Sequence, residues 1–487
     1  MKLVKMKRKE FLKTGLAAGI GAFIPTYKKS HSPNPILGKA KNIIFFSYDG
    51  FSWEDFSSAQ HYSHRNFGRR LNIEKLFQTG SAGSMQSHSL TSMVTDSSAA
   101  TTTWATGRKI VNGALSVYPD GEELTTILEL AKAQGKATGI ISTTRVTHAT
   151  PAGWIAKHVN RRAEEDIAEQ FAEFKADVMI GGGTSEFDPK QRSDGKDLFK
   201  PFIDNGYSVI TETGQLGSLT GDKVLATLNN SHIPYEIDRK FRGIEAPSLR
   251  EMSQKGVEIL DGSENGFVLH IEAGRIDHAN HRNDAGASLW ETLAADDALG
   301  VLMEYVDRTP ETVLIMASDH GTGGPSVYGV GERYRASSDI HDLLNRRTAS
   351  FPWIMDQLGE NPSRSVIIDV LEDATEIRVT PEQAELLQKA IAGDFIMPDP
   401  AAYPRQPIAT LAYILKGGTN DDPTRVNINF GTTQHTAGAV PAAVYGNGVE
   451  VKPFGLVDNT DFFYWMTEAL GINFENPEMT PEKALEF

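Results

Sequence analysis

The chain has 487 residues, enough for one large domain with insertions or for two domains. Its 40% hydrophobic and 23% charged residues are typical of an ordinary soluble globular protein. A formal net charge of −15 argues against a nucleic-acid-binding protein, because such a protein needs a basic face. The absence of cysteine excludes disulfides, Cys-ligated zinc, iron–sulfur clusters and a cysteine nucleophile, so any metal site must use Asp, Glu, His and hydroxyl groups.

The first thirty residues have the pattern of an export signal. Basic side chains are concentrated in residues 2–13, and the mildly apolar stretch 14–25 follows them. Residues 8–13, RKEFLK, are similar to a twin-arginine signal in which Lys replaces the second Arg. We therefore expect a signal peptide over residues 1–30, a Pro-rich linker over 31–40 and a periplasmic or extracellular protein without a membrane span in its mature part. The alternative is a basic, disordered N-terminal tail.

The first predicted strand is the apolar run NIIFFSY, residues 42–48, which leads directly into Asp49 and Gly50. A carboxylate just past the end of a buried strand lies where α/β sheets bind their ligands. By itself an Asp in a strand–turn is common, so Asp49 becomes informative only if other ligands converge on it.

Residues 93–109, MVTDSSAATTTWATGRK, combine Asp96, Ser97 and Ser98 with a run of small residues that reads as a helix. A serine at a helix N-terminus suits a hydroxyl nucleophile, because the free N–H groups and the helix dipole favour an anion such as phosphate. The alternative is an ordinary N-capped helix, since Asp and Ser are common caps.

A helix over residues 125–134 and a strand over 137–143 come next, and the strand runs into the segment TRVTHATP. His148 and Thr150 are two residues apart, so both can point to one side of an extended loop. A helical stretch is expected over residues 157–162, KHVNRR, which ends in two arginines. A planar guanidinium can bind two phosphate oxygens at once, and a solvated helix face is the alternative for an arginine that does not.

The most informative decapeptide is EAGRIDHANH, residues 272–281, which follows the predicted strand 267–271. Asp277 and His281 are four residues apart, so on one helical turn they face the same way and can share a metal ion. Glu272 ends the strand and can face a second ion. His278 is off this pattern, and we interpret it as a surface or supporting histidine.

The strand over residues 312–317 ends in Asp319 and His320, a strong metal signal when other carboxylates already converge. The region 321–429 shows little periodicity and one predicted helix, over residues 381–392. His435 follows in the segment FGTTQHTAG, just before a strand over 440–445, and a last helix over 461–470 is expected to pack on the sheet.

Taken together, VTDSSAATTTWATGRK, YDGFS, HATP, the E-x-x-x-x-D-x-x-x-H order, the strand-terminal DH and the final H-T-x-G are similar to the motifs of the alkaline phosphatase family. The resemblance implies a large, mostly parallel α/β sheet between helices in residues 41–487, with a variable insert at about 321–429, and a homodimer. It implies hydrolysis of phosphate monoesters through a phosphoserine at Ser97. Metal coordination is one way to make a weak serine nucleophile reactive.

The resemblance also assigns ligands. One zinc ion takes Asp277, His281 and His435; a second takes Asp49, Asp319 and His320; and magnesium takes Asp49, Thr150 and Glu272. His148 stands where the family has Asp or His, so the third site takes magnesium or another divalent ion. The family spacing selects Arg162 as the arginine that binds phosphate, with Arg161 as a competitor.

Two other functions stay open at this point. Phosphodiesterases, phosphonate hydrolases and sulfatases of the same superfamily share a related metal core. A metal-loaded, catalytically inactive phosphate-binding protein belongs to a different class.

Overall fold

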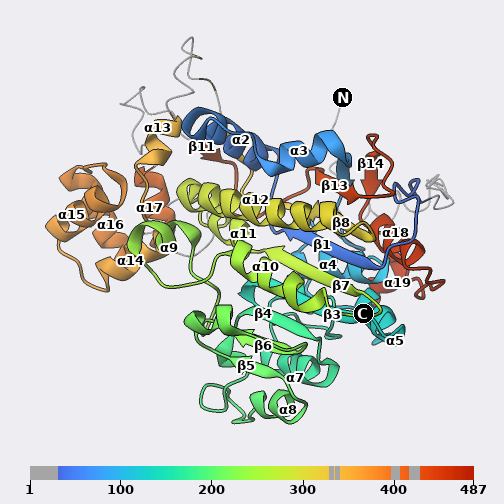
Figure 1. Cartoon of the computed structure of the whole chain (residues 1–487). Helices are drawn as coiled ribbons and strands as arrows, with labels where there is room; N and C mark the ends of the chain where they lie inside the picture. The colour runs from blue at the N-terminus through green and yellow to red at the C-terminus, as the bar shows by residue number, and fades with distance from the viewer. Residues whose placement is uncertain (1–30, 328, 330–333, 335–339, 396–405, 416–427) are drawn as a thin grey trace, which may run out of the picture.

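Ten strands form one central sheet in the computed structural model, which describes residues 31–487 except 328, 330–333, 335–339, 396–405 and 416–427 (Figure 1). In spatial order they are β14 (Gly455–Asp458), β2 (Ser81–Gln86), β13 (Val440–Gly446), β8 (Thr312–Ser318), β1 (Asn42–Tyr48), β7 (Phe267–Ala273), β3 (Ala137–Arg145), β4 (Val178–Gly182), β6 (Val224–Thr227) and β5 (Ser208–Ile210). Strand β13 is antiparallel to both neighbours, and the other adjacent pairs in this sheet are parallel. The expected mostly parallel sheet is thus confirmed.

Strand β1 lies near the middle of the sheet, between β7 and β8, and every residue in it is buried. A strand covered on both faces needs apolar side chains in both directions, and its run of Ile and Phe supplies them. Ile43 and Phe45 enter one hydrophobic core, and Ile44 and Phe46 enter the other. This alternation divides the helices into two layers.

Helices cover both faces of the sheet, as predicted. The core that holds Ile44 includes side chains of α2 (Trp53–Phe67), α3 (Asn72–Thr79), α9 (Glu236–Arg242), α10 (Leu249–Leu260) and α12 (Ala285–Arg308). The core that holds Ile43 includes side chains of α4 (Ser97–Thr106), α5 (Ile127–Ala133), α7 (Glu164–Phe174), α8 (Phe199–Asp204) and α18 (Asp461–Ala469). The remaining short elements outside the region 321–429 are α6 (Ala149–Ala152), α11 (Arg275–Asn280), β12 (His435–Thr436), α19 (Pro481–Ala484) and two 3-10 turns.

The region 321–429 is much more helical than the single helix expected from the sequence. Besides the short strands β9 (Gly321–Thr322), β10 (Pro325–Val327) and β11 (Ile428–Phe430), it contains α13 (Ile340–Asn345), α14 (Phe351–Leu358), α15 (Arg364–Thr375), α16 (Pro381–Ile391) and α17 (Ile408–Leu415). Helix α16 matches the prediction, and the expectation of one helix was wrong. Helices α14 to α17 share a hydrophobic core of their own and form a group beside one end of the sheet (Figure 1).

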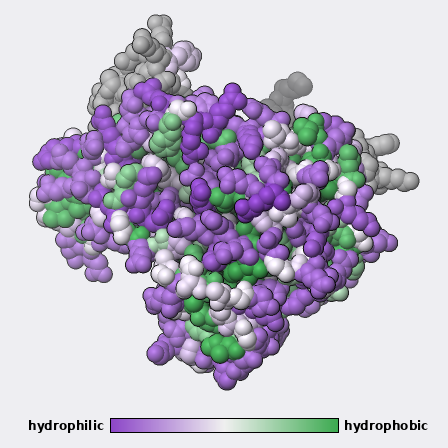
Figure 2. All heavy atoms as spheres, viewed as in Figure 1, coloured by the Kyte–Doolittle hydropathy of each residue, from purple (hydrophilic) through white to green (hydrophobic). Residues whose placement is uncertain are grey.

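The described chain contains no helix that is long and apolar enough to cross a bilayer. Hydrophilic side chains cover most of the face seen in Figure 2, and hydrophobic residues are scattered over it in small groups. Residues 31–40 run along the domain: Ile36 pairs with Val449, and Ala40 donates a hydrogen bond to the carbonyl of Ala469. The predicted signal, residues 1–30, lies outside the described residues.

Candidate active site

The carboxyl ends of three adjacent strands bring acidic residues together. Asp49 follows β1, Glu272 ends β7 and Asp319 follows β8, and all three side chains are fully buried. Parallel neighbours end at the same edge of a sheet, so the convergence follows from topology. Gly50 permits a close approach here, because its φ is +71° and an added Cβ would lie 2.6 Å from the Cα of Asp277.

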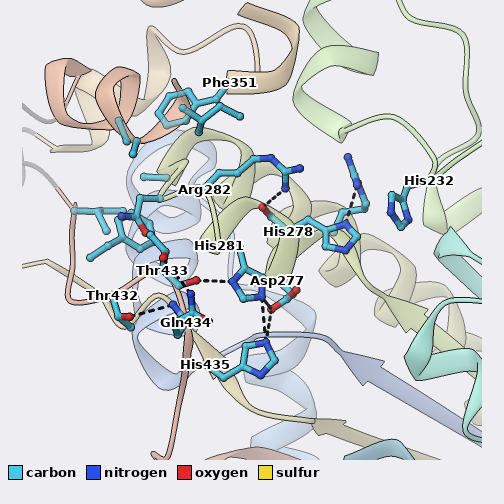
Figure 3. A pocket seen from close by; sticks show the side chains of 18 of the residues that line it. His232, Asp277, His278, His281, Arg282, Phe351, Thr432, Thr433, Gln434 and His435 are labelled. Carbon is cyan, nitrogen blue, oxygen red and sulfur yellow. Dashed lines mark hydrogen bonds and ion pairs between the residues drawn. The ribbon is translucent and has the colours of Figure 1, made fainter. Parts of the chain in front are cut away.

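The first group of possible ligands is Asp277, His281 and His435. The Nε2 of His281 lies 3.3 Å from Oδ1 of Asp277 and 3.1 Å from Nε2 of His435. The Nδ1 atoms of the two histidines meet the carbonyls of Thr433 and Thr95, at 2.6 Å and 2.8 Å. These outer contacts orient both imidazoles with Nε2 toward Asp277, the arrangement that metal-binding histidines use (Figure 3).

The second group, Asp49, Asp319 and His320, adjoins the first. The Nε2 of His320 lies 3.0 Å from Oδ2 of Asp319 and 3.8 Å from Oδ1 of Asp49. The same nitrogen lies 3.3 Å from the hydroxyl oxygen of Ser97. The predicted nucleophile is therefore beside the predicted ligands of the second zinc ion.

A third group lies on the other side of Asp49. The hydroxyl of Thr150 donates to Oδ2 of Asp49 over 3.1 Å, and Asp49, His148 and Glu272 present ligand atoms close enough to share an ion. Thr150 is in the short helix α6, so the expected extended loop was wrong here. Thr144 donates to Glu272 over 3.0 Å and orients it.

Buried atoms at these groups fit divalent cations. One oxygen each of Asp49 and Glu272 is buried without a hydrogen-bond partner among the described residues, and the buried Oδ2 of Asp319 faces Nε2 of His320 at 3.0 Å. Burial and the neighbouring Asp319 raise the pKa of Asp49 well above its usual value, and burial raises the pKa of Glu272 to about 7. Carboxylates crowded in a dry site need positive charge to ionise, and this donor set of oxygens and imidazoles suits zinc and magnesium.

Ser97 is the first residue of α4, as the sequence predicts, and it is 2% exposed. Asp96 caps the helix by accepting a hydrogen bond from the backbone N–H of Ala99 over 3.0 Å. Ser98 is the other candidate nucleophile, but its hydroxyl donates to both oxygens of Asp96 at 2.8 Å. The structure thus separates a serine that faces the metal ligands from one that supports the cap.

The two candidate arginines differ in position. Residues 157–162 are a loop, so the predicted helix was wrong, and Arg161 is held there by its own N–H, which donates to the carbonyl of Gly113. The Arg161 guanidinium lies 3.0 Å from Asp96, next to Ser97, whereas Arg162 is exposed. Although burial opposes ionisation of Asp96, Arg161 holds the pKa of that carboxyl below its usual value. The geometry favours Arg161 as the arginine beside the nucleophile.

Sequence reasoning missed His232, which completes a cluster of three histidines with His148 and His278 next to the third group. The His278 ring lies 4.4 Å from that of His232 and 5.3 Å from that of His148, measured between ring centroids. Burial lowers the pKa of His148 to about 3, and burial together with Arg275 lowers the pKa of His232. His278 therefore supports His148. No local pattern around His232 identifies it, because it reaches the site from a loop after β6.

The first group, Ser97 and His148 line one cavity of about 930 Å³, together with residues of α13, α14 and α17. Figure 3 shows Asp277, His281 and His435 on one wall, with Phe351 of α14 further along. The cavity places a buried serine, its helix N-terminus and an arginine next to side chains that could hold metal ions. This combination suits transfer of a phosphoryl group to a hydroxyl and defines the class of metal-dependent hydrolases.

The comparisons make the class specific: the family model for alkaline phosphatase matches residues 40–388, and the chain belongs to the alkaline phosphatase family. It is 30% identical to alkaline phosphatase 4 of Bacillus subtilis over 92% of each chain. The alkaline phosphatase structure from Thermus thermophilus is 42% identical, with a TM-score of 0.91 over 95% of this chain and 98% of that one. A cold-active alkaline phosphatase from Shewanella is 28% identical, with a TM-score of 0.73 over 88% of this chain and 99% of that one. The predicted family, fold and hydrolysis of phosphate monoesters are confirmed.

Proposed function

We propose that Ser97 accepts the phosphoryl group of a phosphate monoester in a site that holds two zinc ions and one magnesium ion. The first zinc ion takes Asp277, His281 and His435, and the second takes Asp49, Asp319 and His320. Magnesium, or another divalent ion that His148 helps to select, takes Asp49, Thr150 and Glu272. The position of the Ser97 hydroxyl, 3.3 Å from Nε2 of His320, carries the proposal.

When bound, these cations supply positive charge that lowers the pKa of a nearby hydroxyl and stabilises negative charge on transferring oxygens. The side chains and backbone of the protein position the nucleophile and the phosphate. Ser97 Oγ forms the new bond to phosphorus as the alcohol departs, and water then hydrolyses the phosphoserine to release phosphate. The N-terminus of α4 and the Arg161 fork hold the non-bridging oxygens, and Asp96 holds Arg161 in place.

Elemental analysis of the purified protein, combined with rates on an aryl phosphate monoester and the matching diester, tests this function. We expect zinc and magnesium in about a two-to-one ratio and a strong preference for the monoester. A faster rate on the diester would instead indicate a phosphodiesterase. Full metal content with no release of phosphate from the monoester would indicate an inactive phosphate-binding protein.

We also propose that the chain is exported through its basic, apolar N-terminal segment and acts as a homodimer. The sequence of residues 1–30 supports export, and the family resemblance supports the dimer. N-terminal sequencing of protein from the cell envelope should begin beyond the apolar stretch. Light scattering should give about twice the mass of one mature chain; a single-chain mass at assay concentrations would contradict the dimer.

A further inference from the structure

The cavity has an excess of positive side chains in an otherwise acidic protein. Its lining includes three carboxylates and six arginines: Asp96, Glu164, Asp277, Arg145, Arg161, Arg162, Arg275, Arg282 and Arg347. The whole chain carries a formal net charge of −15. A positively charged cleft in a negatively charged protein attracts anionic ligands. One phosphate clamp does not need so many arginines.

The arginines nearest the nucleophile are accounted for. Arg145 forms an ion pair with Glu164, Arg161 pairs with Asp96, and Arg162 is exposed. The remaining three, Arg275, Arg282 and Arg347, have no carboxylate within 4.0 Å in the part of the chain that the structure describes.

Each of these three arginines has one nitrogen that is buried without a hydrogen-bond partner among the described residues, and Arg275 makes the closest ring contact of the three. Arg275 lies 3.9 Å from the Tyr235 ring and 2.8 Å from Nδ1 of His278. Arg282 donates from one nitrogen to the carbonyl of His278 over 2.7 Å and to the hydroxyl of Tyr235 over 3.3 Å, and its Nε is buried without a partner among the described residues. The Arg347 guanidinium lies 5.4 Å from the centre of the Phe351 ring, and one of its terminal nitrogens is buried without a partner among the described residues.

Asp284 offsets the charge of Arg282 and Arg347 only in part, because it forms no ion pair with either arginine within 4.0 Å among the described residues. Asp284 interacts electrostatically with both Arg282 and Arg347, yet its two oxygens accept hydrogen bonds from the backbone of Ala287 and Phe351, at 3.2 Å and 2.7 Å. Burial lowers the pKa of Arg347 despite Asp284. A buried guanidinium whose N–H groups lack acceptors is costly unless an anion binds there.

Two other buried arginines of this protein show the usual arrangement. The fully buried Arg192 side chain lies 2.6 Å from Asp194, and the 4% exposed Arg108 side chain lies 2.8 Å from Glu475. Arg282 and Arg347 depart from this pattern, and both line the cavity. Figure 3 shows Arg282 between Phe351 and the histidines in that view.

We propose that Arg282 and Arg347 form a second phosphate subsite, so that the protein prefers phosphate monoesters whose leaving group carries another phosphate at its far end. A guanidinium fork matches phosphate oxygens, and two forks can share one group. Leu343, Ile408, Ala412 and Phe430 line the same cavity and give a hydrocarbon or ring spacer an apolar wall. The inference rests on the proposed function, because Ser97 must receive the first phosphate.

A series of α,ω-alkanediol bisphosphates of increasing length, each compared with the n-alkyl monophosphate of equal length, tests this subsite. At the spacer length that spans the two sites, we expect kcat/KM for the bisphosphate to exceed that for the monophosphate by about tenfold or more, beyond the twofold from two equivalent ends. Shorter bisphosphates should show only the twofold difference.

Arg282→Gln should reduce the preference at the best length to about twofold. Arg347→Gln is a second variant with the same expected result. Thermal melting shows whether each variant is folded, so the test still works if one of the two misfolds. Arg346→Gln is the matched control, because this exposed neighbour pairs with Glu376 at 3.9 Å and does not line the cavity. It should keep the preference of the unmodified protein.

A preference that is absent at every length, or that survives both substitutions in folded protein, would overturn the subsite. Hydrolysis of the monophosphates in the same assay tests the proposed function separately. If no monophosphate is turned over, calorimetry on the metal-loaded protein decides the subsite. Over the same range of lengths, the tightest-binding alkane bisphosphonate should then bind about tenfold more tightly than the monophosphonate of equal length, and a ratio of no more than about twofold at every length would refute the second subsite.

Discussion

The carboxyl edge of the sheet and the helical insert line the same cavity, but they are built in different ways. At the sheet edge, the ligands follow fully buried strands, and side-chain and backbone hydrogen bonds orient them. Helices α14 to α17 pack around their own core and join the main domain through specific polar contacts, such as Ser350 with Asp238 and Arg242 with Asp373. We therefore expect the chemistry at the sheet edge, with residues of α13, α14 and α17 of the predicted insert lining another part of the cavity. Changes at the edge should alter turnover, and changes at the insert should alter selectivity.

The largest expected effect at the sheet edge is that of Ser97→Ala. Removing the hydroxyl removes the phosphoryl acceptor, so we expect kcat on an aryl phosphate to fall at least ~10³-fold while zinc content stays near that of the unmodified protein. Ser98→Ala is the matched control, because its hydroxyl supports Asp96 and does not face the ligands. Full activity in Ser97→Ala would move the nucleophile to Ser98 or to a water molecule.

Metal removal should affect the sheet edge and leave the helices of the insert unchanged. Chelation should abolish activity and lower Tm by ~5 °C or more, because the buried carboxylates of Asp49, Glu272 and Asp319 lose their counter-ions. Hydrogen exchange should speed up at the ends of β1, β7 and β8, while α15 and α16 keep their protection. A metal-free protein that melts no lower than the loaded one would contradict the proposed ligand groups.

The next largest effect distinguishes two adjacent arginines. Arg161→Gln should lower kcat/KM for an aryl phosphate by ~10- to 100-fold, because the fork beside Asp96 and Ser97 is lost. Arg162→Gln, the matched control, should change it by less than about threefold, because that side chain is exposed. The reverse order of effects would restore Arg162 as the residue that binds phosphate.

The sheet edge was largely predictable because its signals are local. A strand pattern followed at once by Asp49, or by Asp319 and His320, places a ligand at a strand end, and the four-residue spacing of Asp277 and His281 places two on one helical turn. His435 has no comparable geometric signal: its place in the site came from the family motif. Mostly parallel topology then brings the strand ends together without further information.

The rest of the site and of the fold depends on contacts between segments that are distant in sequence, or on helix-start signals that the sequence analysis did not use. Arg161 is fixed by Gly113, far away in sequence, so counting residues along a presumed helix selected its neighbour. His232 likewise has no local signature. Helices α14 and α15 did carry readable starts, because Ser350 and Ser363 cap them through their side chains. Weak periodicity in the insert hid them.

The smallest expected effect concerns the junction between the two regions. Glu291 of α12 is buried and accepts a hydrogen bond from the backbone N–H of Glu236, the first residue of α9, over 2.7 Å. Helix α9 in turn contacts the insert through Asp238 and Arg242. Burial raises the pKa of Glu291 from 4.5 to about 8, so between these values the folded protein keeps a proton that the unfolded chain has lost.

Stability should therefore fall as pH rises from about 4.5 to about 8 and level off above that. Glu291→Gln keeps a hydrogen-bond acceptor but cannot ionise. In this variant, the decrease in the free energy of unfolding between pH 5 and pH 9 should be smaller than in the unmodified protein. The difference should be ~1.4 kcal/mol for each unit by which burial raises the pKa of Glu291. Urea unfolding at both pH values measures this, with the exposed Glu258→Gln as control. If Glu291→Gln loses as much stability as the unmodified protein between these pH values, the Glu291 carboxyl is ionised throughout, and its titration does not weaken the junction between sheet and insert.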